Sequence, residues 1–565
     1  MASSKPGQWY SIPEWYGIQQ QLDGTLLPIT SAYDARNMET GDGNLSVAKG
    51  YEKLVEVVVP DTSPMLKLIA VRGSTKKFYV VTQEHIYAWN ESSPSAWTQV
   101  YEFSPGLTST QVDALQTRIA DRDVILVATG QSQMVKVYTD TDAGSAFGAG
   151  LYSYPPEGET GTVSSYDEDT MTVTLSTALN DESKRRALCY GITIADYYYD
   201  VYEIPDNDLT KVVLTSAMLH EPAEGDAVTV RGGGSNERVA YVELYSNRLF
   251  AAGDPNAPYR LYWSAVPGDG RTIEDWLSVD GSYDASGGYV EVGDGSDDSI
   301  IGLTALSNQL IIWKRYSVWR LFGDRPSTYT LERVDNESDL MSNDGVIVKY
   351  DAPYLLMPNG IYTYNSVSVV PVDNGVKYLR RFFDSKPDVS NSRSAFWNNR
   401  LYMTCKVDEE HDYDDTIIMF DISRNSYMIR DGFQIADIAS IGSDIYLLTP
   451  DRYVCQFEQG TSYDGTAISA YWYTQPTDFG RKMNRHQAMA LYSHITGDGA
   501  KVTVIGDYLS HEKTLTPLTA RAGYTTLRFQ TDRQYFIQYK FENIDSGTFS
   551  FNGGINLYAI SEMEG

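Results

Sequence analysis

The chain has 565 residues, of which 42% are hydrophobic, and a formal net charge of −30 at pH 7. This length exceeds what one ordinary hydrophobic core serves, so we expect several units or a repeat array. The strong acidity repels phosphate and argues against a surface that reads nucleic acid. No run of about 18 apolar residues occurs, which predicts no membrane span.

The cysteine and tyrosine contents further restrict the class of protein to which the chain can belong. Cys189, Cys405 and Cys455 are too few for a disulfide framework, so we expect assembly in a reducing cytoplasm. The first residues lack a basic region followed by an apolar run, and we expect no secretory signal. The 43 tyrosines favour strands and half-exposed interfaces. The composition therefore predicts a β-rich protein that assembles with other chains.

A hairpin pattern recurs along the chain after an entry segment at residues 1–54. Each copy has a polar turn, an apolar strand, a polar tip and a second strand. Four of the steps between copies lie between 44 and 46 residues, a period typical of four-stranded β-propeller blades. We expect about seven blades, although six or eight also fit, and an irregular series of β-sandwich hairpins is the alternative. The first core residues of the copies are Phe78, Val124, Leu249, Leu310, Leu355, Leu401 and Ile445.

One large break interrupts this period. It predicts a small inserted β domain at residues 150–234, between first blades at 55–149 and the remaining blades at 235–460. The stretch "RGGG" at Arg231 lacks the lysine and the helix of a phosphate-binding loop, so a linker is the better interpretation. Helical periodicity is scarce, and residues 108–120 are the best helix candidate.

The last 105 residues keep the strand alternation but lose the 45-residue period. This change predicts a C-terminal β-sandwich at residues 461–565. The predicted fold is therefore all-β.

No motif indicates catalysis. The six histidines show no zinc-ligand spacing, and neither a nucleophile elbow nor a metalloprotease motif occurs. We expect no enzymatic activity, no catalytic residues, no cofactor and no metal. Two acidic loops, at residues 293–298 and 408–415, could hold calcium, but solvated hairpin tips are the simpler interpretation. As candidates for an acidic channel lining we name Asp294, Asp297, Asp298, Asp408, Glu409, Glu410, Asp412, Asp414 and Asp415.

Residues 22–54 resemble the entry segment of large virion proteins of tailed bacteriophages. The hairpins that begin near residues 245 and 306, and the stretch from residue 464 to 480, resemble the same proteins. In short-tailed phages these form the tail nozzle and are called tail tubular protein B or packaged-DNA stabilisation proteins. The insert has no counterpart in this resemblance. The matching entry residues are Asn37, Asp42, Gly43, Leu45, Gly50 and Tyr51.

The resemblance implies a structural virion protein that forms a ring at the distal end of the DNA channel. By analogy with the sixfold tail axis, this ring is expected to contain six copies. Such a nozzle retains packaged DNA, lets it pass on ejection as non-specific cargo, and docks tail fibres or spikes. The implied neighbour is an adaptor or portal-side ring, and the implied location is the virion tail, assembled in the bacterial cytoplasm. The alternative is a glycan-binding or glycan-cleaving propeller used in host attachment.

Overall fold

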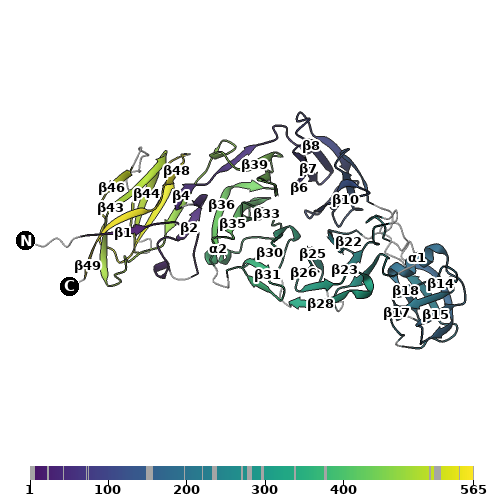
Figure 1. Cartoon of the computed structure of the whole chain (residues 1–565). Helices are drawn as coiled ribbons and strands as arrows, with labels where there is room; N and C mark the ends of the chain where they lie inside the picture. The colour runs from purple at the N-terminus through teal and green to yellow at the C-terminus, as the bar shows by residue number, and fades with distance from the viewer. Residues whose placement is uncertain are drawn as a thin grey trace, which may run out of the picture.

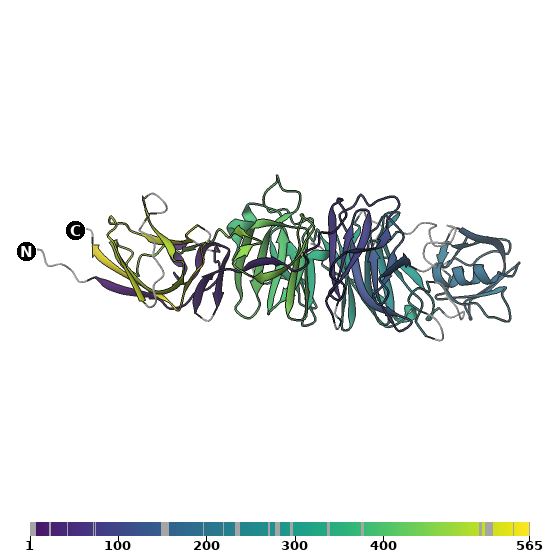
Figure 2. The same ribbon diagram turned by 90° about the horizontal axis from the view of Figure 1, so that it is seen from above.

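The computed structural model describes residues 7–21, 24–41, 43–71, 73, 75–147, 157–195, 197–218, 220–231, 238–268, 272–276, 283–293, 298–335, 339–373, 378–507, 511–514, 524–545 and 547–563. These residues form three units in a row: a β-sandwich at one end, a propeller in the middle and the inserted domain at the other end (Figure 1). The view from above shows the same linear order (Figure 2).

The propeller has seven blades in the described residues. Blades 1 to 6 are antiparallel sheets of four strands in chain order, and blade 7 is completed by a strand from the N-terminal part of the chain. Blade 1 has β6 (Met65–Val71), β7 (Lys77–Thr82), β8 (His85–Asn90) and β9 (Thr98–Glu102); blade 2 has β10 (Asp113–Ile119), β11 (Arg122–Ala128), β12 (Val135–Tyr138) and β13 (Ala143–Ala146). Blade 3 has β21 (Tyr241–Tyr245), β22 (Arg248–Asp254), β23 (Ala257–Trp263) and β24 (Gly288–Glu291). Blade 4 has β25 (Ile300–Leu306), β26 (Gln309–Lys314), β27 (Val318–Phe322) and β28 (Thr330–Asp335).

Blades 5 to 7 complete the ring. Blade 5 has β29 (Val346–Lys349), β30 (Ala352–Met357), β31 (Gly360–Tyr364) and β32 (Val369–Pro371); blade 6 has β33 (Ser394–Trp397), β34 (Arg400–Cys405), β35 (Asp414–Asp421) and β36 (Ser426–Ile435). Blade 7 has β37 (Asp437–Ile441), β38 (Asp444–Leu448) and β39 (Val454–Gln459). Each predicted hairpin is the second and third strand of one blade, so the propeller prediction is confirmed.

The continuous apolar runs in the predicted hairpins result from packing between neighbouring blades. In β26 every residue is buried, because neighbouring blades cover both faces of this strand. Phe250 of blade 3 and Leu310 of blade 4, for example, belong to one hydrophobic cluster. A strand buried on both faces reads as a continuous apolar run and not as an alternation. The first strands of most adjacent blades, such as β21 and β25 or β33 and β37, lie side by side around the centre of the ring.

The last blade is closed by the N-terminal part of the chain. Strand β5 (Gly50–Lys53) pairs antiparallel with β39, and the short strands β40 (Ser462–Tyr463) and β41 (Thr466–Ala467) extend the sheet beyond it. Gly50 allows this closure, because a Cβ atom there would lie 1.9 Å from the backbone oxygen of Ser462. Pairing between strands so distant in sequence was not predicted.

The sandwich combines both ends of the chain. One sheet has the order β1 (Gln8–Ile12), β49 (Ile555–Met563), β43 (Asn484–Gly497), β48 (Phe549–Phe551), β4 (Asn44–Val47) and β3 (Met38–Gly41), with β46 (Tyr524–Arg528) also on β43. The other has the order β2 (Ala32–Arg36), β42 (Tyr471–Thr474), β47 (Ile537–Asn543), β44 (Ala500–Gly506) and β45 (His511–Thr514). Residues 1–54 were expected to lead into the first blade as a separate segment, whereas their strands complete the sandwich and blade 7.

The inserted domain is one strongly bent sheet around a helix. Its strand order is β17 (Tyr197–Tyr199), β16 (Ile192–Ile194), β20 (Ala227–Arg231), β14 (Glu157–Asp167), β15 (Thr172–Leu175), β19 (Lys211–Leu214) and β18 (Val201–Glu203). The helix α1 (Asp181–Tyr190) begins at Asn180, whose side-chain oxygen accepts the Ser183 amide at 2.7 Å. The linker expected at residues 231–234 lies, except for Arg231 at the end of β20, outside the described residues.

Among the described residues, the remaining helices are short. They are α2 (Arg380–Asp384) and the 3-10 turns η1 (Gly24–Leu26), η2 (Pro326–Thr328) and η3 (Asn343–Gly345). The helix expected at residues 108–120 is wrong, because β10 occupies residues 113–119 as an inner strand with several half-exposed side chains. No helix in the described part of the chain is long and apolar enough to cross a membrane. Cys189, Cys405 and Cys455 are buried, and none forms a disulfide.

Candidate binding pocket and central cavity

In the acidic loop at residues 293–298, the carboxylate of Asp298 stabilises a neighbouring turn. Asp294 and Asp297 lie outside the described residues. Asp298 is buried, and its carboxylate accepts hydrogen bonds from the Tyr316 amide at 2.8 Å and the Ser317 hydroxyl at 2.5 Å. The Asp298 carboxylate therefore stabilises the β26–β27 turn. Because it is buried, it does not line an open channel, and the expectation for Asp298 is corrected.

The loop at residues 408–415 joins β34 to β35 in blade 6 and divides into exposed and buried parts. Asp414 is buried and accepts the Thr404 hydroxyl at 2.5 Å, and burial raises its pKa to about 6. Asp415 is buried as well. These two carboxylates hold the loop from inside. Asp414 is therefore corrected as a lining residue, whereas Asp415 still borders the surface pocket that the loop forms. The exposed members are Asp408, Glu409, Glu410 and Asp412.

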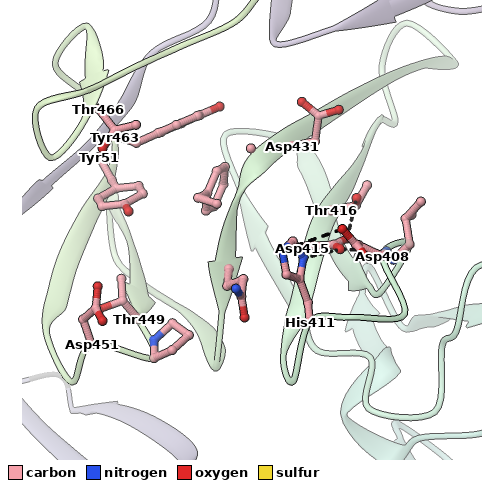
Figure 3. Close-up of a pocket in the computed structure, with 15 residues that line it drawn as sticks. Tyr51, Asp408, His411, Asp415, Thr416, Asp431, Thr449, Asp451, Tyr463 and Thr466 are labelled. Carbon is pink, nitrogen blue, oxygen red and sulfur yellow. Dashed lines mark hydrogen bonds and ion pairs between the residues drawn. The ribbon is translucent and has the colours of Figure 1, made fainter.

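This loop forms one side of an open pocket of about 680 Å³ on the propeller surface. The opposite side comes from β5, the β38–β39 turn and the β40–β41 hairpin of blade 7. In Figure 3, Asp408, His411 and Asp415 face Tyr51 and Tyr463 across the pocket. A volume of this size is typical of sites for small molecules. The sequence reasoning found the acidic loop but missed its aromatic partners, because they come from other elements.

The aromatic side of the pocket is a packed cluster. The rings of Tyr51 and Tyr463 are stacked with centroids 5.5 Å apart, and Phe433 lies 4.4 Å from Tyr463. Gly432 precedes Phe433 in β36 with φ +90°, a conformation that favours glycine, where the pairing of β35 with β36 shifts register. This bulge aims Phe433 and Asp431 at the pocket, a common use of bulges at binding sites.

The acidic side of the pocket is fixed by hydrogen bonds. His411 Nδ1 lies 2.9 Å from Asp415 Oδ2, and His411 Nε2 lies 3.8 Å from Asp408 Oδ2. Burial raises the pKa of Asp415, but hydrogen bonds from the backbone amides of Val407 and Asp408, together with His411, outweigh it and lower this pKa. The carboxylate is therefore ionised and held in place before any ligand arrives.

The described pocket lining offers carboxylates, aromatic rings, one imidazole and hydroxyls as contact groups. An Asp–His pair activates a nucleophile in hydrolases, but the described lining residues include neither serine nor cysteine. The Thr416 hydroxyl donates to Asp415 at 2.9 Å, and the Thr449 hydroxyl donates to the Tyr453 carbonyl at 3.3 Å. These two hydroxyls are thus engaged in structural bonds.

A second site is the central cavity of the propeller, of about 260 Å³, lined by the first strands of the blades and the residues just before them. Asp344, just before β29, pairs with Lys67 of blade 1, and Arg393 Nη1 lies 2.6 Å from Asp344 Oδ2. Arg393 also donates to the Leu66 carbonyl at 3.3 Å. Lys67 and Leu66 belong to blade 1, which is a neighbour of neither blade 5 nor blade 6, so the bonds from Lys67 to Asp344 and from Arg393 to Leu66 cross the ring and close its centre.

The central cavity holds more carboxylates than cations. Burial raises the pKa of Asp344, but Lys67 and Arg393 outweigh this effect and lower it. Burial, with a smaller effect of Asp344, raises the pKa of Asp113 to about 6, and burial raises the pKa of Glu243 to about 7. The sequence did not reveal Asp344, Asp113 and Glu243 as a group, because each lies alone on or just before a different strand.

Two inner strands begin with an aspartate that joins neighbouring blades. The carboxylate of Asp113, at the start of β10, accepts the Val242 amide of the next blade at 2.9 Å. Asp437, at the start of β37, accepts the Leu68 amide of blade 1 at 2.6 Å. Aligning the repeats on their first strands would have revealed this shared position.

One further group of residues has the composition of a metal site. Ligand atoms of Asp61, Glu84 and His85 lie within 4.8 Å of one another. However, Asp61 already accepts hydrogen bonds from the Ser63 amide and the Thr82 hydroxyl, and His85 Nδ1 lies 2.8 Å from it. This arrangement anchors the turn between β7 and β8.

Comparisons with known proteins identify no family. No protein-family model and no curated protein sequence matches the chain. Similar solved structures include BamB from Moraxella catarrhalis, with 8% identity and a TM-score of 0.35 over 72% of this chain and 99% of that one. Virginiamycin B lyase from Staphylococcus aureus has 9% identity and a TM-score of 0.33 over 71% and 96%. The Pan2 WD40 domain of Neurospora crassa has 7% identity and a TM-score of 0.34 over 74% and 97%.

Proposed function

We propose that the chain is a structural virion protein of a tailed bacteriophage, a subunit of a nozzle ring at the distal end of the tail channel. Six copies surround the passage, retain packaged DNA and let it pass on ejection. An adaptor or portal-side ring contacts the nozzle from above, and tail fibres or spikes dock on it. The entry phrase with Asn37, Leu45 and Tyr51 supports this proposal through its resemblance to such virion proteins.

The observation that carries the ring proposal is the closed centre of the propeller. Lys67, Asp344 and Arg393 bridge the central cavity, so a duplex has no path through a single chain. Passage therefore requires a lumen between copies. Asp and Glu total 75 against 45 Lys and Arg, and a predominantly acidic wall would repel phosphates instead of binding them.

Gel retardation tests the acidic wall. Pure protein should leave the mobility of duplex DNA unchanged at about 0.15 M salt, where screening removes weak long-range attraction. Retardation that disappears only at higher salt would show a basic contact surface and contradict the proposal.

The alternative function, recognition or cleavage of a host glycan, draws support from the aromatic and acidic sides of the blade 6–7 pocket. Under our proposal, capsular and cell-wall glycans remain intact when incubated with the pure protein. Release of reducing ends that is abolished by Asp408→Asn or Asp415→Asn would favour the alternative.

A further inference from the structure

The pocket between blades 6 and 7 combines negative charge with an aromatic wall, in which Tyr51 is half-buried and Tyr463 and Phe433 are buried. Four aspartates line it, and no lysine or arginine does so among the described lining residues. We propose that this pocket binds an organic cation, an ammonium or guanidinium group. This inference is independent of the proposed role in a virion. The four aspartates are Asp408, Asp415, Asp431 and Asp451.

The electrostatics of the pocket act on one of its tyrosines. Burial is the largest cause that raises the pKa of Tyr51 to about 12, followed by Cys455, Asp464 and Asp451, of which only Asp451 lines the pocket. The negative potential of Asp451, which opposes a phenolate, also attracts a cation. Asp408 and Asp451 are exposed at the pocket edge, where they can reach an incoming ligand without rearrangement.

The aromatic cluster provides the second half of the recognition. A cation over the face of a tyrosine gains about 0.5–2 kcal/mol, depending on how far it is desolvated. The chain already uses this chemistry beside the pocket: Lys53 Nζ lies 4.1 Å from the Tyr453 ring centroid and 2.8 Å from Asp464 Oδ2. The pocket offers the same pair of groups, carboxylate and ring, without an internal cation among the residues that line it.

The pocket is also preorganised. Asp431 accepts the Asn37 side-chain amide at 2.8 Å and lies 3.2 Å from Arg36 Nε, while Asp415 is held by two backbone amides. Groups fixed before binding lose little entropy when a ligand arrives. The hydroxyls of a neutral sugar can donate hydrogen bonds to these carboxylates but bring no positive charge to offset them, so the arrangement favours a cation over a neutral glycan.

Two sources can deliver this chemistry: a free polyamine, or a lysine or arginine side chain of a partner protein. Isothermal titration of the full chain with spermidine and with N-acetyl-arginine amide distinguishes them, because the tighter ligand identifies the source. N-acetyl-citrulline amide, which has nearly the same shape without the charge, is the neutral control. Binding of at least one cation, with no binding of the citrulline compound, is the expected result.

A matched pair of double variants separates the pocket from the general acidity of the chain. Asp408→Asn with Asp451→Asn should weaken cation binding about tenfold, which corresponds to about 1.4 kcal/mol. Glu409→Gln with Asp412→Asn removes the same number of charges from the same surface, but outside the lining residues, and should change affinity less than twofold. Equal loss in both variants, no cation binding, or preferential binding of a neutral oligosaccharide would overturn the proposal.

Discussion

Asn37 shows what a single residue contributes at the junction of sandwich and propeller. It is 1% exposed with φ +53°, and its side-chain amide donates to Asp431 at 2.8 Å and to the Ser469 carbonyl at 2.8 Å. Its side-chain oxygen accepts the Asp431 amide and the Tyr463 hydroxyl, each at 2.9 Å. The sequence could single out Asn37 through a family resemblance, but not its partners, which are about 400 residues away in the chain.

Replacing this residue should destabilise the chain. Asn37→Ala leaves several buried polar groups without a partner and should lower the free energy of unfolding by about 3 kcal/mol. Urea unfolding followed by tryptophan fluorescence measures the change. Asn359→Ala, in the exposed β30–β31 turn, is the control and should have almost no effect. Equal stability of both variants would contradict the role of Asn37.

The central cavity predicts a pH dependence at a single carboxyl group. The folded-state pKa of Glu243 is about 7, against 4.5 as its ordinary value. Folding therefore favours the protonated form, and its stabilising contribution is lost as the pH rises from about 4.5 through 7. Glu243→Gln, which cannot ionise, should match the wild-type melting temperature near pH 4.5 and exceed it at pH 8. A melting difference that stays constant with pH would contradict the burial of this carboxyl group.

At the scale of elements, periodicity predicted the middle of every blade but not its edges. The central hairpins, such as β26–β27, carry apolar runs that any seven-bladed ring must bury. Inner strands such as β10 face a polar cavity and carry no such signal. The closing strand β5 could not be predicted for another reason. It has only four residues, too few to show a periodicity, and nothing in its sequence indicates a distant partner.

The inserted domain should be removable. Phe147 and Val239, which flank it, belong to the same hydrophobic cluster of blades 2 and 3, so a short Gly/Ser linker can join them. We expect a deletion of residues 148–237 to keep a cooperative thermal transition. The melting temperature should fall by a few degrees, because Cys189 of α1 packs in that cluster with Trp276. Loss of cooperative unfolding would show that the insert is part of the propeller core.

At the scale of the whole molecule, the three units lie in a row and form an elongated protein (Figure 2). Its formal net charge of −30 makes this elongated protein strongly acidic. Composition alone predicted the charge, but not where it gathers. Some candidate carboxylates, such as Asp298 and Asp414, proved to be buried anchors, whereas Asp408 lines a pocket whose other wall comes from blade 7. Such sites depend on loops brought together by ring closure, so they follow from the fold and not from a local pattern.

The ring arrangement is the central claim, and cryo-electron microscopy of the particles that carry this chain tests it most directly. We expect six copies around the tail axis, with the closed propeller centres away from that axis. Aspartate and glutamate should outnumber lysine and arginine on the wall of the lumen between copies. One or three copies at this position, a propeller centred on the axis, or a net basic lumen would contradict the account.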